Sequence, residues 1–200
     1  VLKGLSNIGS FMFNNNVIAV DSVSYEVQYV DLAKEMEAFV NFLRNEESGR
    51  SFIKVTFESP TLLKDPLVIS RKRKKKLLIP LPEAVLSVPV YMVLINEGKA
   101  RKSIFLRCMR YIKSVLDIPY TVLKTINLVW YVYSGKILPA VIGYTKYFID
   151  KQMLQSSQIL MKMKHELDFI ELLSKAVILA QIYGVGDGRA AGFGHISITF

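Results

Sequence analysis

The chain has 200 residues, of which 51% are hydrophobic and 22% are charged, enough apolar material for one large or two small packed domains. This composition excludes an intrinsically disordered chain. The net charge of +9 favours a polyanionic partner, with nucleic acid the first candidate and an anionic membrane surface the second.

The first sixty residues are predicted to form strands around one helix. Residues 17–29 alternate in hydrophobicity, which indicates one or two strands. The stretch "DLAKEMEAFVNFLRN" from Asp31 to Asn45 has apolar residues at helical spacing and an aspartate at the position of a helix cap. "FIKVTFESPTLL" then alternates and turns at Ser59–Pro60, as expected for a strand that leaves its sheet.

The middle of the chain is predicted to be a basic loop followed by two helices. The loop is "SRKRKKKLLIP", and a helix from Pro82 to about Asn96 follows, with Gly98 after its end. The apolar stretch from Leu77 to Ile95 contains three prolines and Glu83, so it predicts a buried helix preceded by a loop rather than a membrane span. A second, amphipathic helix covers "KSIFLRCMRYIKSVL".

The last eighty residues are predicted to form a hairpin, a helix and a final strand. Residues 121–149 are rich in β-branched and aromatic residues around a central "SGK", which indicates a long hairpin. Residues 159–183 return to helical spacing, and a glycine-rich loop and a short strand follow. From Phe52 onward the order is βαββαβ, which predicts an α+β, ferredoxin-like (RRM-like) domain over residues 51–200.

The glycine-rich loop "GVGDGRAAGFG", Gly184 to Gly194, carries five glycines and one arginine. It follows a helix and precedes a strand, the reverse of the order that a dinucleotide-binding loop requires, and it lacks the Lys-Ser/Thr pair of a Walker loop. Two interpretations remain. The loop is either a site where RNA phosphate approaches exposed amides and Arg189, or a helix stop with tight entry into a strand.

Four segments in this order carry a resemblance to a known family: "VTFESPTLLK", "IPLPEAVLSV", "AVIGYTKY" and, most specifically, "YGVGDGRAAGFGHISI". The chain resembles the CRISPR-associated repeat-RNA processing endoribonucleases of the repeat-associated mysterious protein (RAMP) superfamily. The resemblance implies binding of CRISPR repeat RNA and its metal-independent cleavage, in which a 2′-hydroxyl attacks the adjacent phosphate to yield mature guide RNAs. The alternatives are a non-catalytic RNA-binding subunit of a CRISPR effector complex and a basic ferredoxin-like scaffold without an RNA role.

The resemblance implies tandem ferredoxin-like domains, so that residues 1–50 are expected to be a partial N-terminal ferredoxin-like domain or its remnant. It also bears on partners and cofactors. It implies CRISPR repeat RNA and other CRISPR-associated effector subunits as partners and no membrane, and it leaves open whether the chain forms a homodimer. No metal and no other cofactor is expected. The single cysteine, Cys108, offers no disulfide and no thiolate cluster, which is typical of a cytoplasmic protein.

The candidate site residues belong to three groups. His195, directly after the loop, is a candidate catalytic acid or base, the alternative being a polar residue at the start of a strand. His165 is expected to be a surface histidine, and four tyrosines of the hairpin could stack on bases or simply pack: Tyr131, Tyr133, Tyr144 and Tyr147. The candidate RNA-binding residues are those of the glycine loop and of the basic run: Gly184, Gly186, Gly188, Arg189, Gly192, Gly194, Arg71, Lys72, Arg73, Lys74, Lys75 and Lys76.

Overall fold

The computed structural model describes residues 10–13, 16–19, 31–45, 52–68, 76–119, 122–133 and 136–200. Contacts divide the chain into two units, Val1–Asp31 and Leu32–Phe200. In the first unit, β1 (Ser10–Phe13) and β2 (Asn16–Ala19) form an antiparallel hairpin. The assignment of residues 1–50 to a second ferredoxin-like domain stays a prediction.

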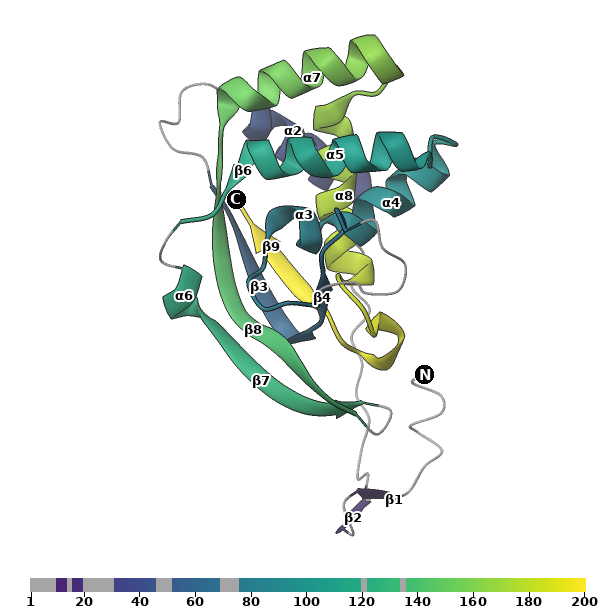
Figure 1. Cartoon of the computed structure of the whole chain (residues 1–200), viewed down its shortest axis with the longest axis vertical. Coiled ribbons are helices and arrows are strands. Elements are labelled where there is room, and N and C mark those ends of the chain that lie inside the picture. The colour runs from purple at the N-terminus through teal and green to yellow at the C-terminus, as the bar shows by residue number, and fades with distance from the viewer. Residues whose placement is uncertain are drawn as a thin grey trace. The chain divides into compact units, whose positions relative to one another are not determined.

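The second unit is built on an antiparallel sheet (Figure 1). Its central strand pairs with strands on both sides, which gives the order β9–β3–β8–β7. Numbered within the domain, this is the order 4-1-3-2 of a ferredoxin-like fold, so the predicted α+β fold class is confirmed. The four strands are β3 (Phe52–Thr61), β7 (Ile126–Tyr133), β8 (Lys136–Ile149) and β9 (Ile196–Thr199).

The predicted hairpin over residues 121–149 is confirmed as β7 and β8, which pair over eight positions. A short helix, α6 (Val122–Thr125), precedes it. Three further short strands complete the unit: β6 (Leu116–Asp117) on the edge of β8, and β4 (Leu63–Lys64) paired with β5 (Lys76–Leu77).

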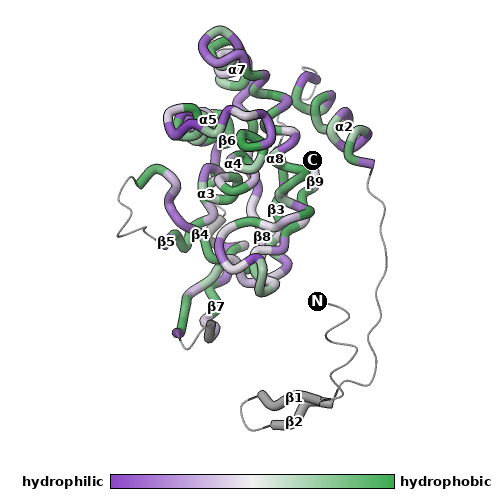
Figure 2. Tube along the Cα trace, turned by 90° about the vertical axis from the view of Figure 1, so that its right-hand side faces the viewer, coloured by the Kyte–Doolittle hydropathy of each residue, from purple (hydrophilic) through white to green (hydrophobic). Residues whose placement is uncertain are grey.

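Besides α6, the described residues form six α-helices. Those predicted at residues 31–45 and 102–116 are confirmed as α2 (Leu32–Arg44) and α5 (Lys102–Val115). Figure 2 shows hydrophilic and hydrophobic residues alternating around both, as expected for helices with one buried side. The remaining helices are α3 (Pro82–Val85), α4 (Ser87–Asn96), α7 (Lys151–His165) and α8 (Phe169–Tyr183).

The helix predicted from Pro82 to Asn96 is interrupted at Leu86, between α3 and α4. Pro89 explains the interruption, because its nitrogen cannot donate to the carbonyl of Val85 and its ring collides with that carbonyl. Pro82 does begin α3, as predicted.

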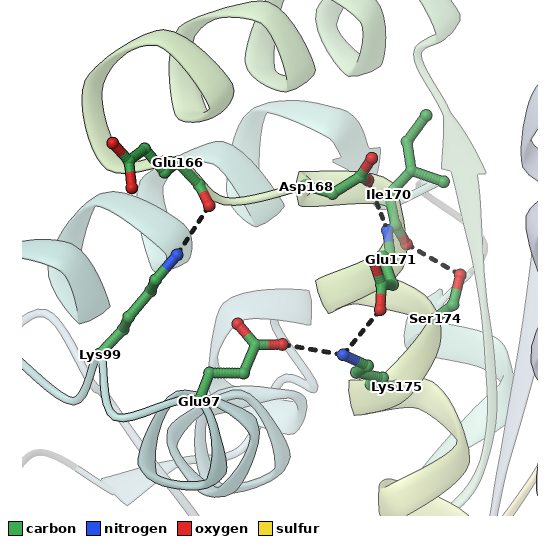
Figure 3. A network of polar contacts seen from close by, with 8 residues as sticks. All are labelled: Glu97, Lys99, Glu166, Asp168, Ile170, Glu171, Ser174 and Lys175. Carbon is green, nitrogen blue, oxygen red and sulfur yellow. Dashed lines mark hydrogen bonds and ion pairs between the residues drawn. The ribbon is translucent and has the colours of Figure 1, made fainter.

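The helix predicted at residues 159–183 is two helices, because the chain turns at Glu166 between α7 and α8. Glu166 has a left-handed backbone conformation (φ 52°), and Asp168 caps α8 by accepting a hydrogen bond from the Glu171 amide at 2.9 Å. Figure 3 shows that Lys99 Nζ donates to the Glu166 carbonyl at this turn, at 2.7 Å, and that Lys175, further along α8, bonds both Glu97 and Glu171. Helical spacing continues across the turn, so it does not appear in the sequence pattern.

The core lies between the helices and one face of the sheet. On β3 the buried residues are Ile53, Val55 and Phe57, which alternate with more exposed neighbours, as expected for a strand with one face against a core. Among the described residues, no helix is long and apolar enough to cross a membrane.

Candidate nucleic-acid interface

The glycine loop connects α8 to β9 and contains one turn of 3-10 helix, Arg189–Ala191. Its five glycines, Gly184, Gly186, Gly188, Gly192 and Gly194, all have positive φ. A backbone of this kind is readily available only to glycine, so the composition of the loop follows directly from its conformation.

Three of these glycines are buried against the chain's own main chain. A Cβ atom at Gly184 would lie 2.7 Å from the Gly194 carbonyl oxygen, one at Gly186 would collide with the Leu62 carbonyl oxygen, and one at Gly194 with that of Val185. Backbone hydrogen bonds join the same segments: the Asp187 amide donates to Leu62 at 2.9 Å, and the Gly194 amide to Pro60 at 3.1 Å. At Gly186 the close approach is therefore made by Leu62, directly after β3, whereas at Gly184 and Gly194 the two ends of the loop approach each other.

The tip of the loop is different. Gly192 is exposed, and no described atom lies within 4 Å of the place that its Cβ would occupy. Arg189 lies in the same turn, half-buried, with one guanidinium nitrogen 3.9 Å from the Met92 sulfur. The hydrogen bonds of the described residues leave the amides of Arg189 and Ala190 without an acceptor. The tip therefore offers donors and one positive charge to an anion.

One hollow of about 430 Å³ lies beside this tip. Arg189 and His195, which were predicted from the sequence, both line it, together with Ser59 and Tyr183. His195 is exposed; its amide donates to Ser59 Oγ at 2.9 Å, and its carbonyl accepts from the Glu58 amide at 2.9 Å. A histidine, a tyrosine, a serine and an arginine therefore line one hollow.

Sequence reasoning missed Tyr183 and Ser59. Tyr183 is 54% exposed at the end of α8. Its position directly before Gly184 was the signal that the sequence offered. For Ser59 the sequence predicts only a turn. Its place in the hollow depends on the end of β3 lying beside the start of β9, which the sequence pattern does not show.

A second hollow, of about 510 Å³, lies on the other side of Arg189. Lys64 and Lys102 line it, with Tyr91 and Phe105, whose rings pack edge to face at 5.8 Å. Lys64 also forms an ion pair with Asp187 of the loop. Arg189 thus lines both hollows, and the lining of the second is aromatic and of mixed charge, since Asp65 and Asp187 also belong to it.

The basic run falls mostly outside the described residues, which do not include Arg71 to Lys75. Lys76 is described: it is exposed in β5, opposite Lys64 of β4. Because Lys64 lines the second hollow, the end of the basic run is attached to a strand beside the glycine loop.

The hairpin tyrosines divide by environment. Tyr147 is buried and donates to the Pro80 carbonyl at 2.6 Å, and burial followed by the Glu83 charge raises the pKa of its phenol. Tyr131 packs its ring against Phe193 of the glycine loop at 4.4 Å. Tyr144 is 37% exposed on the sheet, and the side chain of Tyr133 lies outside the described residues.

Other titratable groups lie away from the loop. Burial raises the pKa of the Cys108 thiol to about 12, so this thiol is not a nucleophile at neutral pH. His165 lies at the end of α7, with Nε2 3.0 Å from Arg107, and partial burial and then this guanidinium lower its pKa. The described residues contain no group of three or more His, Cys, Asp or Glu placed to hold a metal ion.

No protein-family model and no curated protein matches the chain. Among solved structures, Cas6 (TTHB231) of Thermus thermophilus matches at a TM-score of 0.52 and 12% identity, over 85% of this chain and 58% of that one. A product complex of Cas6 (TTHB231) matches at 0.49 and 12%, over 80% and 55%. A partial Cas6-RT-Cas1–Cas2 complex matches at 0.48 and 17%, over 91% and 28%.

The chain therefore spans less than two thirds of the length of the Cas6 protein that it matches at the highest of these scores. The resemblance expected from the sequence, to CRISPR repeat-RNA processing endoribonucleases, is confirmed at the level of the fold: the described domain has the fold of a Cas6 protein.

Proposed function

We propose that this chain binds CRISPR repeat RNA and cleaves it without a metal ion, by attack of a 2′-hydroxyl on the adjacent phosphate. The observation that carries the proposal is the hollow beside the glycine loop, where His195, Tyr183 and Arg189 meet in a domain with the fold of Cas6. The net charge of +9 supports a polyanionic substrate.

The hollow supplies the groups that the reaction requires. His195 accepts the proton of the 2′-hydroxyl as the oxygen bonds to phosphorus. Tyr183 donates a proton to the 5′-oxygen as the phosphorus–oxygen bond breaks, which leaves a 2′,3′-cyclic phosphate and a free 5′-hydroxyl. Arg189 and the free amides beside it stabilise the charge that develops on the phosphate oxygens. The proton on His195 then returns to Tyr183, directly or through water.

The test is cleavage of labelled repeat RNA from the CRISPR array of the same genome, in excess EDTA, with the product ends analysed for cyclic phosphate. His195→Ala and Tyr183→Phe should each reduce the cleavage rate by about 10²- to 10⁴-fold, the range of general acid–base catalysis, with little change in affinity. Arg189→Ala should weaken binding and cleavage together while leaving thermal stability nearly unchanged, because a partly exposed arginine contributes little to folding.

A matched control is His165→Ala, which removes the histidine at the end of α7. This variant should cleave like the parent. Equal losses in His165→Ala and His195→Ala would contradict the assignment of His195 to the reaction.

One observation favours a second candidate, a non-catalytic RNA-binding subunit of a CRISPR effector complex. A catalytic general base is usually held in position by a hydrogen bond to another side chain. No side chain among the described residues bonds the His195 imidazole. Binding of repeat RNA without any cleavage would assign the chain to this second class.

A further inference from the structure

The face of the sheet turned away from the core displays a set of aromatic and lysine side chains that the hollow beside the glycine loop does not use. On β3, Phe52 and Lys54 alternate with the buried Ile53 and Val55. On β8, Tyr144, Lys146 and Phe148 alternate with the buried Thr145, Tyr147 and Ile149. We call the five outward residues Phe52, Lys54, Tyr144, Lys146 and Phe148 the lysine–aromatic face.

The register between the two strands brings these side chains together. Phe52 lies opposite Phe148, and Lys54 lies opposite Lys146. Tyr144 lies opposite Thr56, one step further along. The five residues are therefore contiguous on two neighbouring strands.

The side chains contact one another in a regular way. The Phe52 and Phe148 rings pack edge to face with centroids 6.2 Å apart. Lys146 Nζ lies 4.4 Å above the Phe52 ring, and Lys54 Nζ lies 4.7 Å above the Tyr144 ring. In both contacts the residue of β3 meets the β8 residue that lies two positions before its own register partner. Each ammonium group is therefore held over an aromatic ring on the outer face of the sheet.

We propose that the lysine–aromatic face binds single-stranded RNA, by stacking bases on Tyr144 and Phe148 and by pairing the two lysines with phosphates. The proposal rests on the RNA binding proposed above and adds a second contact surface for the same substrate. Its chemistry is that of sequence-tolerant single-strand recognition, which combines aromatic stacking with cations.

The lysine over Tyr144 does not prevent stacking there, and Lys146 lies over Phe52 rather than over Phe148. An exposed cation–π contact favours the bound arrangement of its two groups by about 2- to 5-fold in the equilibrium constant. Stacking of a nucleobase on an aromatic side chain favours binding by about 5- to 150-fold. A base therefore displaces the ammonium from the ring, and the flexible lysine remains within reach of the phosphate that arrives with the base.

The geometry also indicates the path of the RNA across the sheet. Tyr144 and Phe148 are four residues apart on β8, about 13 Å at the usual rise of a strand, so two bases can stack without touching each other. Glu58, further along β3, accepts a hydrogen bond from Ser197 Oγ at 2.7 Å. Its negative charge disfavours phosphate there, so the phosphates lie toward Lys54 and Lys146.

The experiment measures binding of a fluorescein-labelled 12-nucleotide oligouridine to the full chain by anisotropy at several salt concentrations. Tyr144→Leu and Phe148→Leu, which keep apolar bulk and lose the ring, should each weaken binding by about 5- to 10-fold. Lys54→Gln combined with Lys146→Gln should reduce the slope of log K against log salt by about 1.4, which is 0.7 for each phosphate contact.

Matched controls exist elsewhere in the domain. Phe42 of α2 also lies under a lysine, with Lys151 Nζ 5.6 Å from its ring, so Phe42→Leu tests a ring of the same kind away from the sheet. Lys162→Gln with Lys164→Gln removes two exposed charges from α7. All of these controls should bind the oligouridine like the parent, and thermal melting should show each variant folded.

The outcomes separate this inference from the proposed function. Unchanged affinity and slope in all sheet variants, with a loss in Arg189→Ala, would overturn the inference and leave the proposed function standing. Unchanged RNA affinity with altered self-association of the sheet variants would reassign the face to a protein contact. If the parent binds neither oligouridine nor repeat RNA, both proposals are wrong.

Discussion

Glu83 is a buried carboxyl group in the first turn of α3, 2% exposed. Its Oε2 has no hydrogen-bond partner among the described residues. Burial raises the pKa of this carboxyl above its ordinary value of 4.5; the nearby Asp65 charge adds to the rise, whereas its own backbone amide and Lys113 oppose it. The charged form is therefore unfavourable in the folded state.

This shift predicts a pH dependence of stability. Between the ordinary pKa and the raised one, the folded state binds a proton that the unfolded state has released, so the free energy of unfolding should fall as pH rises through this interval. Glu83→Gln should remove this contribution, at most about 1.4 kcal/mol per pH unit. Urea unfolding from pH 4 to 8 measures it. Glu37→Gln, at an exposed position of α2, is the control; equal slopes in parent and Glu83→Gln would contradict the prediction.

At the scale of elements, the turn between α7 and α8 holds a non-glycine residue in the left-handed region. The Glu166 amide bonds the Lys162 carbonyl at 3.1 Å, and the Leu167 amide bonds that of Met161 at 3.4 Å, an arrangement that usually has glycine at this position. The backbone strain of a non-glycine residue in this region costs about 1 kcal/mol.

Glu166→Gly should therefore stabilise the protein. The backbone carbonyl that accepts from Lys99 remains, so only the strain is removed, and we expect a gain of about 1 kcal/mol and a rise in melting temperature of about 2–4 °C. Lys164→Gly, in the last turn of α7, should destabilise by about 1 kcal/mol, since glycine there has only its low helix propensity. Calorimetry compares the two; a loss of stability in both variants would count against the assigned turn.

Two substitutions within the glycine loop should differ in their effect on the free energy of unfolding. Gly186→Ala places a Cβ against the Leu62 carbonyl, whereas Gly192→Ala meets no described atom and strains only a φ of 84°. The first variant should lose more than about 2 kcal/mol and the second about 1 kcal/mol. Urea unfolding measures both; equal losses would show that the loop is not packed on the end of β3 as described.

At the scale of the whole molecule, the charge of +9 predicts strongly salt-dependent RNA binding. Replacing the run Arg71–Lys76 by glutamine should weaken binding with little sequence preference and flatten the salt dependence by about 0.7 for each phosphate contact removed. Filter binding of two unrelated RNAs from 50 to 300 mM salt measures this. An affinity and a slope equal to those of the parent would make the run a solvated loop.

Much of the fold follows from local patterns. Alternation in "FIKVTFE" and the β-branched run around "SGK" predict β3, β7 and β8, and helical spacing predicts α2 and α5, because strands and helices with one buried side repeat at 2.0 and 3.6 residues. The breaks at Leu86 and Glu166 escape this method, since apolar spacing continues through both and only Pro89 gives a local warning.

What the sequence determined by itself is the order of the elements, the glycine loop and the presence of Arg189 and His195 beside it. What only the tertiary structure decided is which side chains meet: Tyr183 and Ser59 in the hollow with them, and Lys54 over Tyr144 on the sheet. The physical reason is that periodicity fixes the side of an element on which a residue lies. Contacts between segments far apart in the sequence depend instead on strand register and loop closure, which are properties of the folded chain as a whole.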